Sequence, residues 1–170
     1  QGMRKTAQGI MLAGFVFVFF ALPFAGVDLL IDAVGFLLVW NGLAALQKLN
    51  KTFGAAPLVC LALVAVAAAQ LFFEGAAAQV LRAVRVAGEV VLYWQMLKGF
   101  ARQAPKRAVP LPAWLFWCGF AVCAAAGLLY FAGLAAPLPP QVVAAAQWAG
   151  RIAILGLLAV LVITEKNDGN

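Results

Sequence analysis

Five ionisable side chains stand inside long apolar segments of the sequence, where a charge is costly. An ionised side chain at the centre of a bilayer costs about 2.5–3.5 kcal/mol on insertion scales, so such groups are expected to face the protein interior and to pair. A guanidinium binds a carboxylate or a phosphate through two parallel hydrogen bonds. Three arginines among the five would therefore suit a small polar or anionic solute. The five residues are Asp32, Arg82, Arg85, Glu89 and Arg151.

The segment 77–100 carries three of these groups at helical spacing. Arg82, Arg85, Glu89 and Tyr93 follow one another at intervals of 3, 4 and 4 residues, which places them on one stripe of an α-helix. The tyrosine adds a hydroxyl that can donate or accept a hydrogen bond. This segment is therefore predicted to supply most of a polar site.

A second predicted helix adds two more polar groups. Gln147 and Arg151 are four residues apart, so they share one face of that helix. The candidate ligand-binding site then contains five charged and two neutral residues. Its members are Asp32, Arg82, Arg85, Glu89, Tyr93, Gln147 and Arg151.

Depth in the membrane indicates which of these charges pair. Counted from the outer helix ends at about 1.5 Å per residue, Asp32 is shallowest, Arg82 and Arg85 come next, and Glu89 and Arg151 lie near mid-depth. We therefore predict that Glu89 and Arg151 pair. Asp32 lies nearer one end and is predicted to pair with Arg82 or Arg85. Arg85 and Glu89 can also pair along their own helix, because they are four residues apart. A network in which every charge is paired would only fix the register of the helices, and this structural alternative stays open beside the solute site.

Catalytic chemistry has little support in the composition. The sequence contains no histidine and no serine, so it offers neither a serine nucleophile nor a histidine ligand. The cysteines Cys60, Cys118 and Cys123 stand singly in apolar segments and are expected to be small core residues. We therefore expect no enzyme activity, no metal site and no cofactor.

The composition shows which elements must position these groups. Hydrophobic residues make up 66% of the 170 residues and charged residues 11%, against about 45–50% and about 25% in soluble domains. A membrane-spanning helix needs about 20 apolar residues, and six such stretches are present. Because short connections make consecutive helices antiparallel neighbours, we predict an all-α integral membrane protein, a bundle of six transmembrane helices in three hairpins with short loops. The expected spans are Gln8–Ala25, Leu29–Leu46, Ala55–Phe73, Ala77–Phe100, Pro112–Ala135 and Gln141–Thr164.

The loop charges predict the orientation of this single domain, which covers residues 3–166 between a tag remnant at residues 1–2 and a polar tail at 167–170. Lys and Arg accumulate on the cytoplasmic side of membrane proteins. Nine of them fall at one end of the predicted bundle, whereas the loops at the other end carry only Asp28 and Glu74. Both termini are therefore predicted to be cytoplasmic, and the net charge of +6 needs no nucleic acid to explain it. The nine residues are Arg4, Lys5, Lys48, Lys51, Lys98, Arg102, Lys106, Arg107 and Lys166.

Small residues predict close contacts between helices. Gly9 with Gly14, and Gly35 with Gly42, would allow two helices to approach closely. Such faces leave open a helix-packing protein partner or a homo-oligomer. Membrane lipids are the other partner that the composition implies.

The segment Gly14 to Leu49 resembles the opening of a family of small multi-helix membrane proteins from Firmicutes bacteria. Members of that family have a helix, a short turn with an aspartate, and then a segment close to LLPDFIGYILIFIGL. Here the match is Asp28 to Leu38, with Ile31 in place of the proline and Ala33 in place of the phenylalanine. The family has no assigned activity, so the resemblance implies a bacterial cytoplasmic (inner) membrane and no particular function.

The predicted architecture gives a second resemblance. Six helices in 170 residues, with both termini inside and a polar pocket facing outward, are similar to the substrate-binding components of energy-coupling-factor vitamin transporters, by analogy of fold alone. We expect first a protein that binds or transports a small solute through an outward-facing intramembrane site. The second expectation is a non-transporting structural or accessory protein, or a partner-dependent substrate-binding component. A membrane enzyme is the least favoured of the three functions, because the composition gives catalysis little support.

Overall fold

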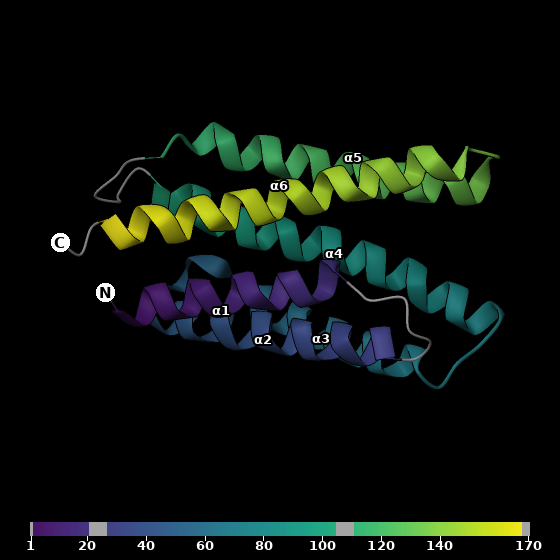
Figure 1. Ribbon diagram of the computed structural model, residues 1–170, viewed down its shortest axis with the longest axis horizontal. Coiled ribbons are helices and arrows are strands. Elements are labelled where there is room, and N and C mark those ends of the chain that lie inside the picture. Colours follow the sequence, from purple (N-terminus) through teal and green to yellow (C-terminus); the bar gives the residue numbers. More distant parts are fainter. Residues whose placement is uncertain (1, 21–26, 105–110, 168–170) are drawn as a thin grey trace.

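The computed structural model describes residues 2–20, 27–104 and 111–167, and all of its regular structure within them is helical. The prediction of an all-α chain with six helices is confirmed for these residues (Figure 1). A single 3-10 turn, η1, separates the second and third helices. The elements are α1 (Gly2–Phe19), α2 (Val27–Leu49), η1 (Lys51–Phe53), α3 (Ala56–Gln70), α4 (Ala76–Gln103), α5 (Ala113–Ala135) and α6 (Pro140–Asn167).

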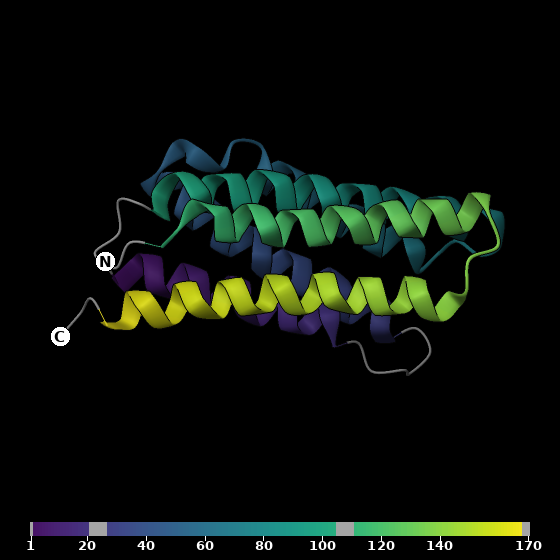
Figure 2. The ribbon, with the colours of Figure 1, turned by 90° about the horizontal axis from the view of Figure 1, so that it is seen from above.

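The six helices run side by side along the long axis of the molecule, as both ribbon views show (Figures 1 and 2). Each helix packs against the next one in the sequence, and α6 packs back against α1. The bundle is therefore a closed ring of antiparallel neighbours. Both chain ends lie at one end of this ring, as the three-hairpin prediction requires.

Three helices are long and apolar enough to cross a membrane, judged by length and composition within the described residues. They are α2 over Leu30–Leu49, α5 over Ala113–Ala135 and α6 over Pro140–Thr164. The expectation of six such helices is thus confirmed for three. The others fall short for physical reasons: α1 begins with a basic, polar turn, α3 has only 15 residues, and α4 carries the charged stripe.

Several predicted boundaries shift by a few residues. The third helix ends at Gln70 rather than Phe73, and a turn leads to Gly75, whose φ of 68° suits glycine. The fourth continues past Phe100 to Gln103. The turn expected at Pro23 and Gly26 lies outside the described residues.

Apolar side chains fill the half of the ring that holds the termini. The fully buried phenylalanines include Phe15, Phe53, Phe100 and Phe116. The rings of Phe53 and Phe100 meet edge to face at 5.0 Å, and Phe15 lies 6.1 Å from Tyr93 across the bundle. This half is therefore a packed core, and polar groups gather in the other half.

Helices α1 and α2 approach closely through glycines. A Cβ atom on Gly14 would lie 2.6 Å from the carbonyl oxygen of Gly35, and one on Gly35 would lie 2.7 Å from the carbonyl oxygen of Gly14. Gly42 is equally crowded by α1, with Ala7 O at 2.6 Å, whereas Gly9 has open space around it. The predicted close contact is thus present at Gly14, Gly35 and Gly42, and Gly9 takes no part in it.

Candidate functional site

A cavity of about 320 Å³ lies in the half of the ring opposite the termini. Every one of the six helices contributes to its wall. Six of the seven residues predicted for the site line it, and the structure thus brings them together. The wall consists of Val18, Asp32, Gln70, Arg82, Arg85, Val86, Glu89, Tyr130, Gln147 and Arg151.

Arg85 holds both carboxylates of the cavity. Its Nη1 donates to Oδ2 of Asp32 at 2.6 Å, and its Nε donates to Oε1 of Glu89 at 3.1 Å. The guanidinium also lies 5.3 Å from the ring centroid of Phe36, in cation–π contact. The predicted pairs of Arg85 with Asp32 and with Glu89 are therefore both present, on a single guanidinium.

Arg151 does not pair with Glu89, and that prediction is wrong. The guanidinium of Arg151 instead lies 5.2 Å from the ring centroid of Trp148 and 5.8 Å from that of Phe19. Among the described residues it makes no ion pair or hydrogen bond. The rings attract the charge through their faces, so they hold the guanidinium while its N–H donors stay available.

Arg82 is the third arginine of the cavity and the most exposed. No carboxylate of the described chain lies within ion-pair distance of it. The described wall of the cavity thus holds three guanidiniums and two carboxylates, and Arg85 binds both of these carboxylates. Two arginines therefore remain whose donors no described residue uses.

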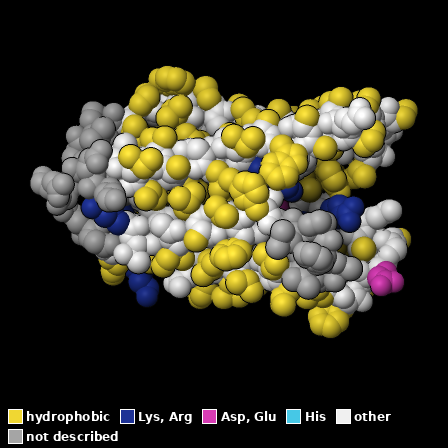
Figure 3. Space-filling model, in the orientation of Figure 1, with side chains coloured by type: hydrophobic (Ala, Val, Ile, Leu, Met, Phe, Trp, Pro, Cys, Tyr) yellow, Lys and Arg dark blue, Asp and Glu magenta, His cyan; other side chains and the backbone are white. Residues whose placement is uncertain are grey.

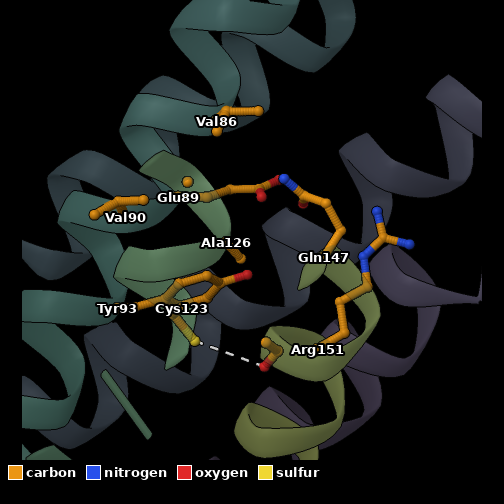
Figure 4. A pocket seen from close by; sticks show the side chains of 10 residues that line it. Val86, Glu89, Val90, Tyr93, Cys123, Ala126, Gln147 and Arg151 are labelled. Carbon is orange, nitrogen blue, oxygen red and sulfur yellow. Dashed lines mark hydrogen bonds between the residues drawn. The ribbon is translucent and has the colours of Figure 1, made fainter. Parts of the chain in front are cut away.

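Tyr93 lies in a recess of about 20 Å³ next to the cavity, not in the cavity itself (Figure 4). Glu89, Gln147 and Arg151 line both spaces, so the recess continues the cavity toward the packed core. Figure 4 shows Glu89 and Gln147 extending toward each other above Tyr93. The volume suits about one water molecule, so the recess can hold a water or a single small group of a ligand.

Cysteine side chains take structural roles near this site. Cys123 lines the recess and its Sγ donates to the carbonyl oxygen of Gly150 at 3.6 Å (Figure 4). Cys60 donates in the same way to the carbonyl oxygen of Phe36 at 3.1 Å. These contacts agree with the prediction of buried, small residues for both; Cys118 is exposed.

The sequence reasoning missed Gln70 and Tyr130 as wall residues. Gln70 ends α3, and its Oε1 is buried without a hydrogen-bond partner among the described residues. Tyr130 comes from an apolar stretch of α5. The one signal that could have found them is depth, because both lie near the helix ends that close this half of the ring.

The outer surface is mostly apolar on the face shown in Figure 3. Lys and Arg side chains appear there at the end that carries the termini, and again in a notch at the opposite end. Among the described residues, no group of three or more His, Cys, Asp or Glu could hold a metal ion. On the face shown in Figure 3, Lys and Arg side chains also show near the middle, between the two ends.

Comparison of the chain with family models, with curated proteins and with solved structures finds no match.

Proposed function

We propose that this chain is a six-span protein of a bacterial cytoplasmic membrane that binds or transports a small polar or anionic solute in the cavity. The observation that carries the proposal is the pair of arginines, Arg82 and Arg151, which line the same cavity and form no ion pair with a described carboxylate. A guanidinium in an apolar environment calls for a counter-ion. A solute with a negative group supplies one.

Six spans follow from the ring if its three apolar helices cross the bilayer. Helix α1 packs between α6 and α2, and α3 and α4 lie between α2 and α5. All six run along the same axis (Figures 1 and 2). The outward face of α4 supports this arrangement, because Val80, Val84 and Val91 are exposed while Arg85 and Glu89 turn inward.

The positive-inside rule supports an outward-facing cavity. The basic termini and the loop with Lys51 lie at one end, and Glu74 and the cavity lie at the other. With the basic end in the cytoplasm, the cavity opens away from it. The packed aromatic core then separates the cavity from the cytoplasm, as expected for a receptor or for one state of a transporter.

The direct test is thermal unfolding of the purified protein against a panel of small metabolites of every charge. A ligand at 100 times its dissociation constant adds about 2.7 kcal/mol to the free energy of unfolding, so a bound solute raises the melting temperature. The double variant Arg82→Gln/Arg151→Gln should lose that rise. Arg102→Gln is the matched control, because Arg102 is an exposed arginine at the opposite end of α4. A panel without any effect would contradict the proposal.

A purely structural role is the second candidate, favoured by the way Arg85 joins both carboxylates. Removing Asp32 or Arg85 should destabilise the bundle under either role, so such variants do not discriminate. Arg82 and Arg151 do discriminate. In a purely structural protein no metabolite raises the melting temperature, so replacing Arg82 and Arg151 removes no such rise.

A further inference from the structure

We infer that the solute is a monocarboxylate and that Arg151 binds its carboxylate. This inference rests on the proposed function and makes it more specific, because it names both the chemical class of the ligand and the residue that receives it. It gives Arg85 a different part, that of a positioning residue. Three features of the cavity support the inference. They are the availability of each guanidinium's donors, the net charge of the described wall, and the neutral groups around Arg151.

The first feature is that only one guanidinium is both fixed and available. Arg85 already donates to Asp32 and Glu89. Arg82 is available but exposed, and no aromatic ring of the described chain holds it. The guanidinium of Arg151 is held over the rings of Trp148 and Phe19. No described residue uses its N–H donors, so they are available to a planar acceptor.

The second feature is the charge of the cavity wall. The described residues of the wall, three arginines and two carboxylates, together leave one positive charge. A ligand with one negative charge makes the filled cavity neutral, which is the least costly state in an apolar surrounding. A dicarboxylate would leave an uncompensated negative charge. A phosphate ester, at about −1.5 to −2 near pH 7, would do the same.

The third feature is the arrangement of neutral groups around Arg151. Gln147 lies one turn before it on α6 and lines the same two spaces. Tyr93, only 7% exposed, points its hydroxyl toward the recess and makes no hydrogen bond with a described residue (Figure 4). These uncharged groups can bind a hydroxyl or carbonyl of the ligand without adding charge. A carboxylate at Arg151 with a short neutral chain therefore fits the wall.

The test uses isothermal titration of the purified full-length chain with matched probes. The probes are straight-chain monocarboxylates, hydroxymonocarboxylates, dicarboxylates of the same lengths, the corresponding neutral amides, and inorganic phosphate. We expect a monocarboxylate to bind at least tenfold more tightly than its dicarboxylate and amide counterparts, a factor equal to about 1.4 kcal/mol. Tighter binding of a dicarboxylate, phosphate or amide would overturn this inference and leave the solute site intact. Binding of no probe, here or in the metabolite panel, would overturn the proposed function as well.

Variants test whether Arg151 itself binds the carboxylate or only adds positive charge to the cavity. Arg151→Gln should weaken monocarboxylate binding at least tenfold, and Arg151→Lys should restore only part of it because an ammonium lacks the planar fork. Arg102→Gln should leave binding unchanged. Glu89→Gln raises the positive charge of the cavity by one and should shift the preference toward the dicarboxylate. If Arg151→Gln does not yield a folded bundle, Arg151→Lys alone decides, and unchanged binding in that folded variant overturns the role of Arg151.

Discussion

The guanidinium of Arg85 on α4 donates to the carboxylate of Asp32 on α2 across 2.6 Å. These two helices are not neighbours in the ring, because α3 lies between them. The ion pair therefore crosses the interior of the bundle and links two of its sides. Both side chains are largely buried, with 13% and 7% of their surfaces exposed.

Replacing Asp32 by Ala should lower the free energy of unfolding by about 3 kcal/mol, because it breaks a buried ion pair and leaves Arg85 with Glu89 alone. Glu89→Ala should cost less, since Glu89 is more exposed and contacts Arg85 along the same helix. Thermal and denaturant unfolding in detergent would measure both.

A double-mutant cycle supplies the control for this pair. Asp32→Asn combined with Arg85→Gln should cost less than the sum of the two single changes, as coupled residues do. Strict additivity would contradict a direct interaction between the two side chains.

Much of this site could be predicted from the sequence because charge in an apolar helix must turn inward. Helical spacing placed Arg82, Arg85 and Glu89 on one stripe, and depth brought Asp32 beside them. The choice of partner for Arg151 could not be predicted. It depends on where Trp148 and Phe19 place their rings, which tertiary packing decides and which no spacing encodes.

The fold could be predicted from the sequence to a similar extent. Apolar periods and turn residues gave six helices and three hairpins, and short loops gave antiparallel neighbours. The contact between α1 and α6 that closes the ring was not predictable. The two helices are far apart in the chain, and their apolar sequences do not indicate which helices they pack against. Apolar content also overstated how many helices qualify as membrane spans, since α1, α3 and α4 are not both long and apolar enough among the described residues.

Gly14→Ala should destabilise the bundle by about 1–3 kcal/mol, the usual cost of adding a methyl group to a packed interface. The new Cβ atom would meet the carbonyl oxygen of Gly35 at 2.6 Å, a backbone atom that cannot rotate away. Unfolding measurements on the purified protein check the effect. Gly9→Ala is the matched control on the same helix, because nothing lies within 4 Å of its added atom. Equal losses in both variants would contradict a specific α1–α2 contact.

Single cysteines should report six spans and their direction. Cys118 is the one exposed native cysteine, whereas Cys60 and Cys123 are buried, so Cys118→Ala gives a background of low reactivity. Lys51→Cys and Glu74→Cys then lie at opposite ends of the bundle, and both positions are exposed. In intact cells a membrane-impermeant maleimide should label Glu74→Cys and leave Lys51→Cys unlabelled until the cells are lysed.

The labelling pattern distinguishes six spans from fewer. If α3 and α4 stayed on one side of the membrane, the positions 51 and 74 would share a compartment and would react alike. Labelling of Lys51→Cys alone in intact cells would reverse the orientation that the nine basic residues predict.

The Arg82→Gln variant should change the rate at which the solute associates and leave its dissociation rate nearly unchanged. Arg82 is exposed and makes no ion pair with the described residues, so its loss should change the free energy of unfolding by no more than about 0.5 kcal/mol. A charge at the edge of a site acts mainly on the association rate and is screened by salt. We therefore expect slower association at low ionic strength, a smaller dependence of that rate on salt, and a dissociation rate close to that of the parent protein. Stopped-flow measurements with the ligand identified by titration check all three. A faster dissociation with an unchanged association rate would place Arg82 in direct contact with the solute, and the exposed guanidinium would then share the role assigned to Arg151.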